Sequence, residues 1–125
     1  MNAEKEARRL AESDFRFMTV IWDNEPVGSM KLVELCLAEL EWKKSTTFTM
    51  LRKMCEKGFA VNRNSVVTSL VSREQVKKTE SEVFVDNVFA GSLPDFLVSF
   101  LGGKKIPDSE AQELRRLIEE HTESE

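Results

Sequence analysis

The sequence predicts a mostly α-helical fold with one small β-hairpin, and three observations support this prediction. Apolar residues recur at helical spacing along most of the 125 residues. One short stretch after Gly58 instead carries β-branched runs around an Asn-rich turn. The chain holds only 5 glycines and 3 prolines, so few positions interrupt its helices. Its length corresponds to about one domain, with room for a second small lobe.

Three helices are expected before the hairpin. The first starts as early as Ala3, carries apolar residues from Leu10 to Trp22 and ends near Asn24. The second begins at Ser29, a residue type that is favoured as a helix N-cap. Its expected buried face consists of Met30, Val33, Leu37 and Leu40.

The third helix is expected to cover residues 44–57, after a short polar link. Gly58 follows as its left-handed cap. The hairpin comes next, with strands at 59–61 and 65–70 joined by a turn at 62–64. Tight connections therefore join three helices and a hairpin in this order.

Three further helices follow the hairpin. The first spans 72–91 and opens with a capping-box pair, Ser72 and Gln75. The second begins at Ser92, and the last begins within 107–109 and ends in an acidic tail. The second half of the chain is thus expected to be a helical lobe.

Composition argues against an enzyme, a metal centre and a membrane protein. The single histidine, His121, lies near the C-terminus, and no nucleophile elbow or phosphate loop is present. Cys36 and Cys55 have no second Cys or His at ligand spacing, so neither a metal nor another cofactor is expected. No run approaches the roughly 18 apolar residues of a membrane span, and the N-terminus has no signal-peptide core. We therefore expect a cytoplasmic protein without membrane insertion.

Charge is distributed unevenly along the chain. The formal net charge of −4 would by itself argue against a nucleic-acid partner. However, residues 43–63 contain six basic residues and one acidic residue, whereas residues 76–125 contain six basic and eleven acidic residues. A local basic segment can bind a polyanion even in an acidic protein.

The order of three helices and a hairpin is that of a winged helix. On a helical wheel of the third helix, Thr46, Thr49 and Lys53 fall opposite Phe48, Leu51 and Cys55. Hydroxyls, a thioether and amines can contact bases and phosphates in a major groove, although a polar face can also simply meet water. The predicted DNA-binding residues are Lys43, Lys44, Ser45, Thr46, Thr49, Met50 and Lys53, with Arg63 at the tip of the hairpin.

Ordered motifs along nearly the whole chain resemble the penicillinase-repressor family of BlaI/MecI type. The motifs are residues 17–22 (Phe-Met-Thr-Val-Ile-Trp), 42–58 (Trp-x-x-x-Thr-x-x-Thr-Met-Leu-x-Lys-Met-x-x-Lys-Gly), 70–74, 84–93 and 113–117. The resemblance implies a winged-helix DNA-binding domain at 1–71 and a helical dimerisation domain at 72–125. It also implies a homodimeric repressor on a palindromic operator in double-stranded DNA, with recognition contacts at Lys44, Ser45, Thr46, Thr49 and Lys53.

Apolar residues in the second half exceed what three short helices can hide alone, so a partner subunit is expected to cover some of them. The candidate dimer residues are Val76, Val83, Phe84, Val88, Phe89, Phe96, Phe100, Leu114 and Ile118.

Four departures from the family pattern separate this chain from typical members. Lys43-Lys44 replaces the usual Ser-Pro before the recognition helix, the wing is shorter, and the cysteine-rich tail of copper-responsive members is absent. Ser99-Phe100 stands at the Asn-Phe bond where penicillinase members are cleaved during induction. Cleavage there by a membrane-bound sensor protease is a hypothesis for this chain. The alternative function is a dimeric protein-interaction module on a winged-helix scaffold with degenerate DNA binding.

Overall fold

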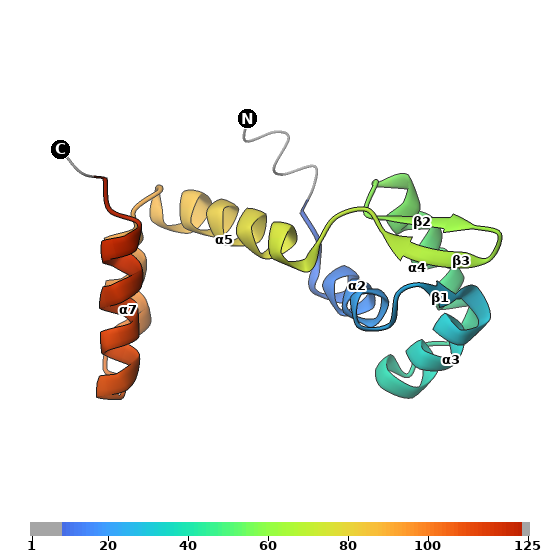
Figure 1. Cartoon of the computed structure of the whole chain (residues 1–125), viewed down its shortest axis with the longest axis horizontal. Helices are drawn as coiled ribbons and strands as arrows, with labels where there is room; N and C mark the ends of the chain where they lie inside the picture. Colours follow the sequence, from blue (N-terminus) through green and yellow to red (C-terminus); the bar gives the residue numbers. More distant parts are fainter. Residues whose placement is uncertain (1–8, 124–125) are drawn as a thin grey trace.

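The computed structural model describes residues 9–123 and confirms the mostly helical fold with a small sheet (Figure 1). Its elements are α2 (Glu12–Asn24), β1 (Val27–Gly28), α3 (Ser29–Leu40), α4 (Lys44–Glu56), β2 (Ala60–Arg63), β3 (Val66–Ser69), α5 (Arg73–Phe89), α6 (Leu93–Leu101) and α7 (Asp108–Glu120). The expected helix start at Ala3 lies outside the described residues. Within them, the first helix begins at Glu12.

The sheet has three antiparallel strands in the order β1-β3-β2. Arg63 on β2 pairs with Val66 on β3, and the two residues between them, Asn64 and Ser65, have φ values of 53° and 63°. Positive φ at both central residues defines the two-residue turn that suits the twist of a hairpin. The expected turn at 62–64 is therefore wrong by one to two residues. The sequence did not predict strand β1, because a strand of two residues is too short to show an alternating apolar pattern.

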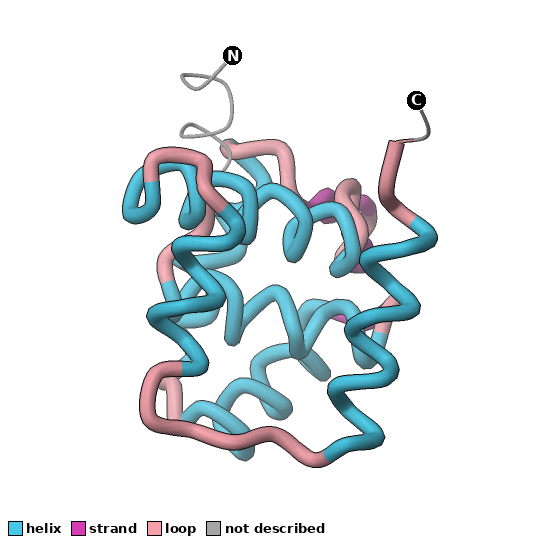
Figure 2. Tube along the Cα trace, turned by 90° about the vertical axis from the view of Figure 1, so that its left-hand side faces the viewer, coloured by secondary structure: helices cyan, strands magenta, loops and turns pink. Residues whose placement is uncertain are grey.

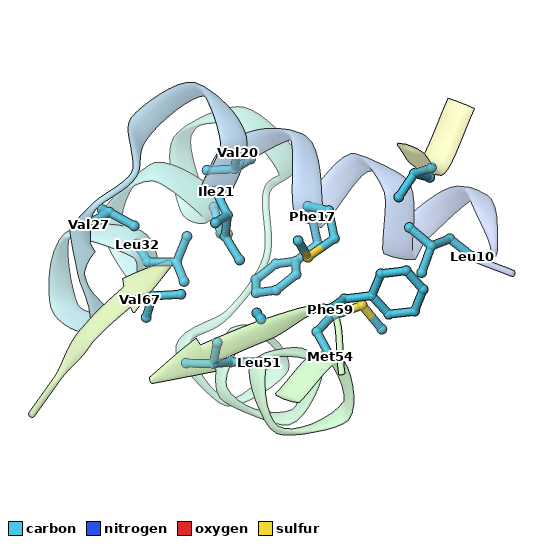
Figure 3. Packing of buried hydrophobic residues seen from close by; sticks show 14 residues of the cluster. Leu10, Phe17, Val20, Ile21, Val27, Leu32, Leu51, Met54, Phe59 and Val67 are labelled. Carbon is cyan, nitrogen blue, oxygen red and sulfur yellow. The ribbon is translucent and has the colours of Figure 1, made fainter. Parts of the chain in front are cut away.

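The core lies where α2, α3, α4 and the sheet meet (Figure 3). Its most deeply buried apolar side chains are Phe17, Met18, Ile21, Leu32, Cys36, Met54 and Val67. Phe17 also stacks on Trp42, which precedes α4, with ring centroids 5.8 Å apart. This packing fixes the orientation of α4.

Helix α3 buries a different face from the one expected. Leu32 and Cys36 are fully buried, whereas Met30 and Leu37 are 55% and 60% exposed. Gly28, not Ser29, is the N-cap, because β1 runs directly into the helix and the Ser29 N–H donates to the carbonyl of Ser65 at 2.8 Å. The sequence of α3 offers two apolar stripes, and this strand-to-helix connection selects which one faces the core.

Helix α5 leads from the N-terminal domain to a separate lobe formed by α6 and α7 (Figure 1). Figure 2 shows α6 and α7 running in opposite directions, joined by a loop at the bottom of the view. The capping box predicted at the start of α5 is confirmed between Ser72 and Gln75. The predicted start of the next helix at Ser92 is also confirmed, since the Ser92 hydroxyl accepts the Asp95 N–H as the N-cap of α6. No residue of α6 or α7 is buried.

None of the helices within residues 9–123 is by itself long and apolar enough to cross a membrane. Among the described helices, only α5 and α6 taken together meet the length and composition expected of a span, and this pair is bent by 85°.

Candidate nucleic-acid interface

Helix α4 packs one face on the core and turns the other outward. Thr47, Leu51 and Met54 are buried, whereas Thr46 and Thr49 are exposed. Ser45 and Lys53 are also exposed, and Met50 is half-buried. The predicted outward orientation of this face is confirmed. Of the residues expected on the core side, Leu51 is buried, and Phe48 and Cys55 are half-buried against the core. Thr47 and Met54, which were not expected there, are fully buried.

The outward face of α4 is slightly hollowed. A shallow depression of about 390 Å³ is lined by Ser45, Thr46, Thr49, Met50 and Lys53. Three hydroxyl side chains that can donate and accept hydrogen bonds thus lie beside a thioether and an amine. Such a surface matches the mixture of acceptors, donors and methyl groups in a major groove.

The N-terminus of α4 presents positive charge and unpaired backbone donors. Lys43 is the N-cap residue, and no side chain among the described residues caps the helix. The first turn holds no acidic residue, and both Lys43 and Lys44 are exposed. The Lys44 Nζ lies 5.9 Å from the centre of the Phe48 ring. A helix start of this kind favours a phosphate group, because the N–H groups and the helix dipole both attract an anion.

Lys53 has a partner inside the protein. Its Nζ lies 3.0 Å from Oδ1 of Asp14, a residue on α2 that is only 1% exposed. The other carboxylate oxygen of Asp14 accepts the Ala11 N–H at 3.2 Å at the start of α2. The charge of Lys53 is therefore compensated within the chain. Sequence analysis missed Asp14, although an acid that shares a helical face with Phe17 and Ile21 was a usable signal.

The hairpin places Arg63 beside its two-residue turn rather than at its tip. The Arg63 side chain is exposed and makes no ion pair with any residue between 9 and 123. The opposite end of the hairpin is anchored to the loop after α2, where the Glu25 carboxylate accepts the Ser69 N–H at 2.8 Å and its hydroxyl at 2.9 Å. The short wing is thus held firmly at its base, and its basic residue points into solvent.

The two cysteines have the character of packed side chains. Burial raises the pKa of the Cys36 thiol, an effect that the nearby Thr47 hydroxyl partly opposes. Burial also raises the pKa of the Cys55 thiol. Both therefore remain protonated near neutral pH, which is unfavourable for metal ligation or nucleophilic attack. In the described part of the chain, no three His, Cys, Asp or Glu residues gather to hold a metal ion.

The candidate dimer residues divide into two groups. Val76 and Val83 are each 3% exposed, so one chain already covers them, and Val76 belongs to the N-terminal core. Phe84, Phe89, Phe96 and Phe100 form a chain of ring contacts with centroids 5.5 to 6.0 Å apart. The most exposed members of the set are Phe84 (44%), Val88 (59%), Phe100 (54%), Leu114 (37%) and Ile118 (55%). The lobe therefore carries apolar surface that its own helices do not bury.

The model of the penicillinase repressor family matches residues 10–120 of this chain. The chain belongs to the penicillinase repressor family. The predicted resemblance is thus confirmed over both the N-terminal domain and the C-terminal lobe.

Curated relatives of this repressor align along most of its length at low identity. The methicillin resistance regulatory protein MecI of Staphylococcus aureus strain Mu50 is 22% identical over 113 residues, which cover 87% of this chain and 92% of the relative. The penicillinase repressor of Bacillus licheniformis is 23% identical over 122 residues, which cover 94% of each chain. The family consists of transcriptional regulators rather than enzymes, in agreement with the expectation from the motifs.

Proposed function

We propose that this penicillinase-repressor family member binds a palindromic operator in double-stranded DNA as a homodimer, with α4 as its recognition helix. The observation that carries the proposal is the outward face of α4, which joins hydroxyls to an uncapped, basic helix N-terminus. The proposed contacts are Lys43, Lys44, Ser45, Thr46, Thr49 and Met50 on or beside α4, with Arg63 on the wing. Lys53 lies on the same face, and its pairing with Asp14 gives it a structural role as well.

The exposed apolar surface of the C-terminal lobe supports the homodimer. Helices α6 and α7 bury no residue within one chain, although Phe100 and Ile118 are large and apolar. A second copy offers the same surface, and a two-fold interface of this kind is self-complementary. Two recognition helices related by a two-fold axis would then read two inverted half-sites.

We divide the chain at the start of α5, with the DNA-binding domain at 1–71 and the dimerisation domain at 72–125. The first half of α5 packs on the N-terminal domain through Val76, whereas its second half carries Phe84 and Phe89 toward α6. One helix thereby belongs to the packing of both domains.

Relief of repression by proteolysis at Ser99–Phe100 fits the position of this bond in α6. Both residues are exposed, and the bond lies just before Gly102, the C-cap of the helix. A cut there would separate α7 from the rest of the chain and place the stacked rings of Phe96 and Phe100 on different fragments. Incubation with a membrane-bound sensor protease of this family should yield a fragment that ends at Ser99 and is monomeric by sedimentation. A chain that stays intact would count against this route.

Two substitutions on α4 test the proposed DNA contacts. Thr49→Ala should weaken binding to an operator selected from a random DNA pool by about 1 to 3 kcal/mol if the Thr49 hydroxyl or methyl group contacts a base. Lys44→Gln should weaken binding more evenly across sequences and reduce the slope of log affinity against log salt by about 1 per half-site. Both effects can be measured by fluorescence anisotropy over a range of salt concentrations.

The matched control for the charge change is Lys105→Gln, which removes an exposed lysine from the loop between α6 and α7. Its affinity and salt slope should equal those of the wild type. If Thr49→Ala and Lys44→Gln also bind like the wild type, α4 is not the recognition helix. The winged-helix domain would then serve as a protein-interaction module.

A further inference from the structure

Helix α5 is tied to the start of the N-terminal domain by a single carboxylate. Oε1 of Glu80 lies 3.2 Å from Nη2 of Arg9 and accepts from Nε of the same guanidinium at 3.4 Å. Oε2 of Glu80 accepts the backbone N–H of Leu10 at 3.2 Å. Glu80 therefore holds a segment 70 residues away in sequence through both a side chain and the backbone.

A second set of contacts lies at the first turn of α5. The indole N–H of Trp22 donates to the carbonyl of Val71 at 2.9 Å, just before α5 begins. The guanidinium of Arg73 lies 5.5 Å from the Trp22 ring and also forms an ion pair with Asp23. Arg73 thus contacts Trp22 and Asp23 in the C-terminal half of α2. Glu80 instead binds the residues that precede α2.

The proposed recognition helix α4 is also linked to the Arg9 segment. At the C-terminal end of α4, Nζ of Lys57 donates to the carbonyl of Arg9 at 2.9 Å, so the Arg9 segment touches both α4 and α5. Between Arg73 and Glu80, the side chain of Val76 packs in the hydrophobic core of the N-terminal domain. The direction of α5 relative to α4 is therefore fixed at three places along α5.

We propose that Glu80 and Arg73 are positioning residues that determine which spacing between operator half-sites this repressor accepts, although neither lies on the DNA-binding face. This inference rests on the proposed homodimeric function. Figure 1 shows that α5 leads from α2, α3, α4 and the sheet to the lobe of α6 and α7. In the proposed dimer, the subunits meet at this lobe. The angle of α5 to α4 sets the separation and rotation of the two recognition helices in the dimer.

The physical reason is that both half-sites must be engaged at once for tight binding. Binding of the second half-site adds affinity only if both recognition helices can reach their half-sites at the same time. A rigid connection between the two helices allows this for few half-site spacings. Each added base pair moves a half-site along the duplex and rotates it around the axis, with a full turn every 10 to 10.5 base pairs. A rigid dimer should therefore discriminate strongly between spacings, and a loosened one should not.

Neither ion pair is expected to be needed for folding. The Arg9 and Glu80 side chains are 37% and 26% exposed, and Arg73 and Asp23 are 33% and 51% exposed. Partly exposed pairs of this kind contribute little to stability, and Val76 stays in the core when they are removed. Without these ion pairs, the winged-helix domain should change its orientation relative to α5 more freely, while the domain itself remains folded.

The test compares the wild type with Glu80→Ala/Arg73→Ala on duplexes that the wild type selects from a random pool. Derivatives of the best duplex have one, two or five base pairs inserted at the centre, and a further duplex carries one half-site only. The wild type should lose about tenfold or more in affinity on the altered spacings. The variant should lose less than about threefold, with unchanged binding to the single half-site and unchanged dimerisation by sedimentation. The control is Glu74→Gln/Lys78→Gln, which changes exposed residues of the same helix.

The possible results separate this inference from the function on which it rests. If the variant keeps the spacing preference of the wild type, Glu80 and Arg73 do not set it, and the dimeric repressor stands without them. If the variant loses half-site binding as well, the contacts support the domain fold. The inference then survives only if the milder single variants Glu80→Gln and Arg73→Lys keep half-site binding and still relax the spacing preference. If the wild type selects no paired half-sites, the proposed homodimeric function fails first.

Discussion

Replacing Ile118 by Glu is expected to convert the repressor into monomers and to lower its operator affinity by about a hundredfold or more. Ile118 is 55% exposed on α7, next to Leu114 and Leu117, which are 37% and 39% exposed. A carboxylate at this position would have to be desolvated in a dimer interface without a partner. Loss of the dimer removes the gain from simultaneous binding to two half-sites, which is typically 10² to 10⁴ in affinity.

Sedimentation velocity and operator-binding isotherms measure the two effects together. The matched control is Arg115→Gln, which changes the net charge by the same amount on an exposed position of the same helix. It should stay dimeric and bind normally. A dimeric Ile118→Glu variant with wild-type affinity would place the subunit interface elsewhere in the chain.

Replacing Lys53 by Ala should lower the free energy of unfolding by about 1 to 3 kcal/mol in the absence of DNA. The substitution leaves the Asp14 carboxylate, which is 1% exposed, without its cation. Breaking a fully buried pair costs about 3 to 5 kcal/mol. The Lys53 side chain is 49% exposed, so solvent reduces this cost. Urea unfolding followed by circular dichroism measures the change.

A double-mutant cycle with Asp14→Ala isolates the interaction between the two side chains. The double variant should be more stable than the sum of the two single losses predicts, because it contains no unpaired buried charge. Arg52→Ala is the control, since Arg52 is an exposed neighbour on α4. Equal stability of Lys53→Ala and Arg52→Ala would show that the Asp14 contact does not contribute to folding.

Local signals predicted the helices well because caps and apolar periodicity act over a few residues. Ser72 and Gln75 form the capping box that their spacing indicates, and α6 begins directly after Ser92 as expected. The same signals could not choose between the two apolar stripes of α3, because that choice depends on how β1 enters the helix. Met30 and Leu37 consequently lie in solvent, and Leu32 and Cys36 lie in the core.

The sequence predicted which face of α4 carries the candidate site, and it did not predict the interactions that the site residues make with the rest of the chain. The spacing of Thr46 and Thr49 indicated the outward side of α4 correctly, since helical geometry alone determines it. The Asp14 partner of Lys53 and the burial of Val76 depend on segments distant in sequence, which no local pattern reports. Arg63 lies on β2 rather than in the turn, because the two-residue connection is formed by Asn64 and Ser65.

Selection of bound duplexes from a random DNA pool, followed by a salt titration of the best sequence, tests the repressor account most directly. We expect an enriched inverted repeat whose half-sites lie one or more helical turns apart. Affinity for it should fall steeply with salt, because each lysine that meets a phosphate releases a counterion. Binding without sequence preference, or no binding at all, would contradict the account and favour a winged-helix domain that recognises another protein.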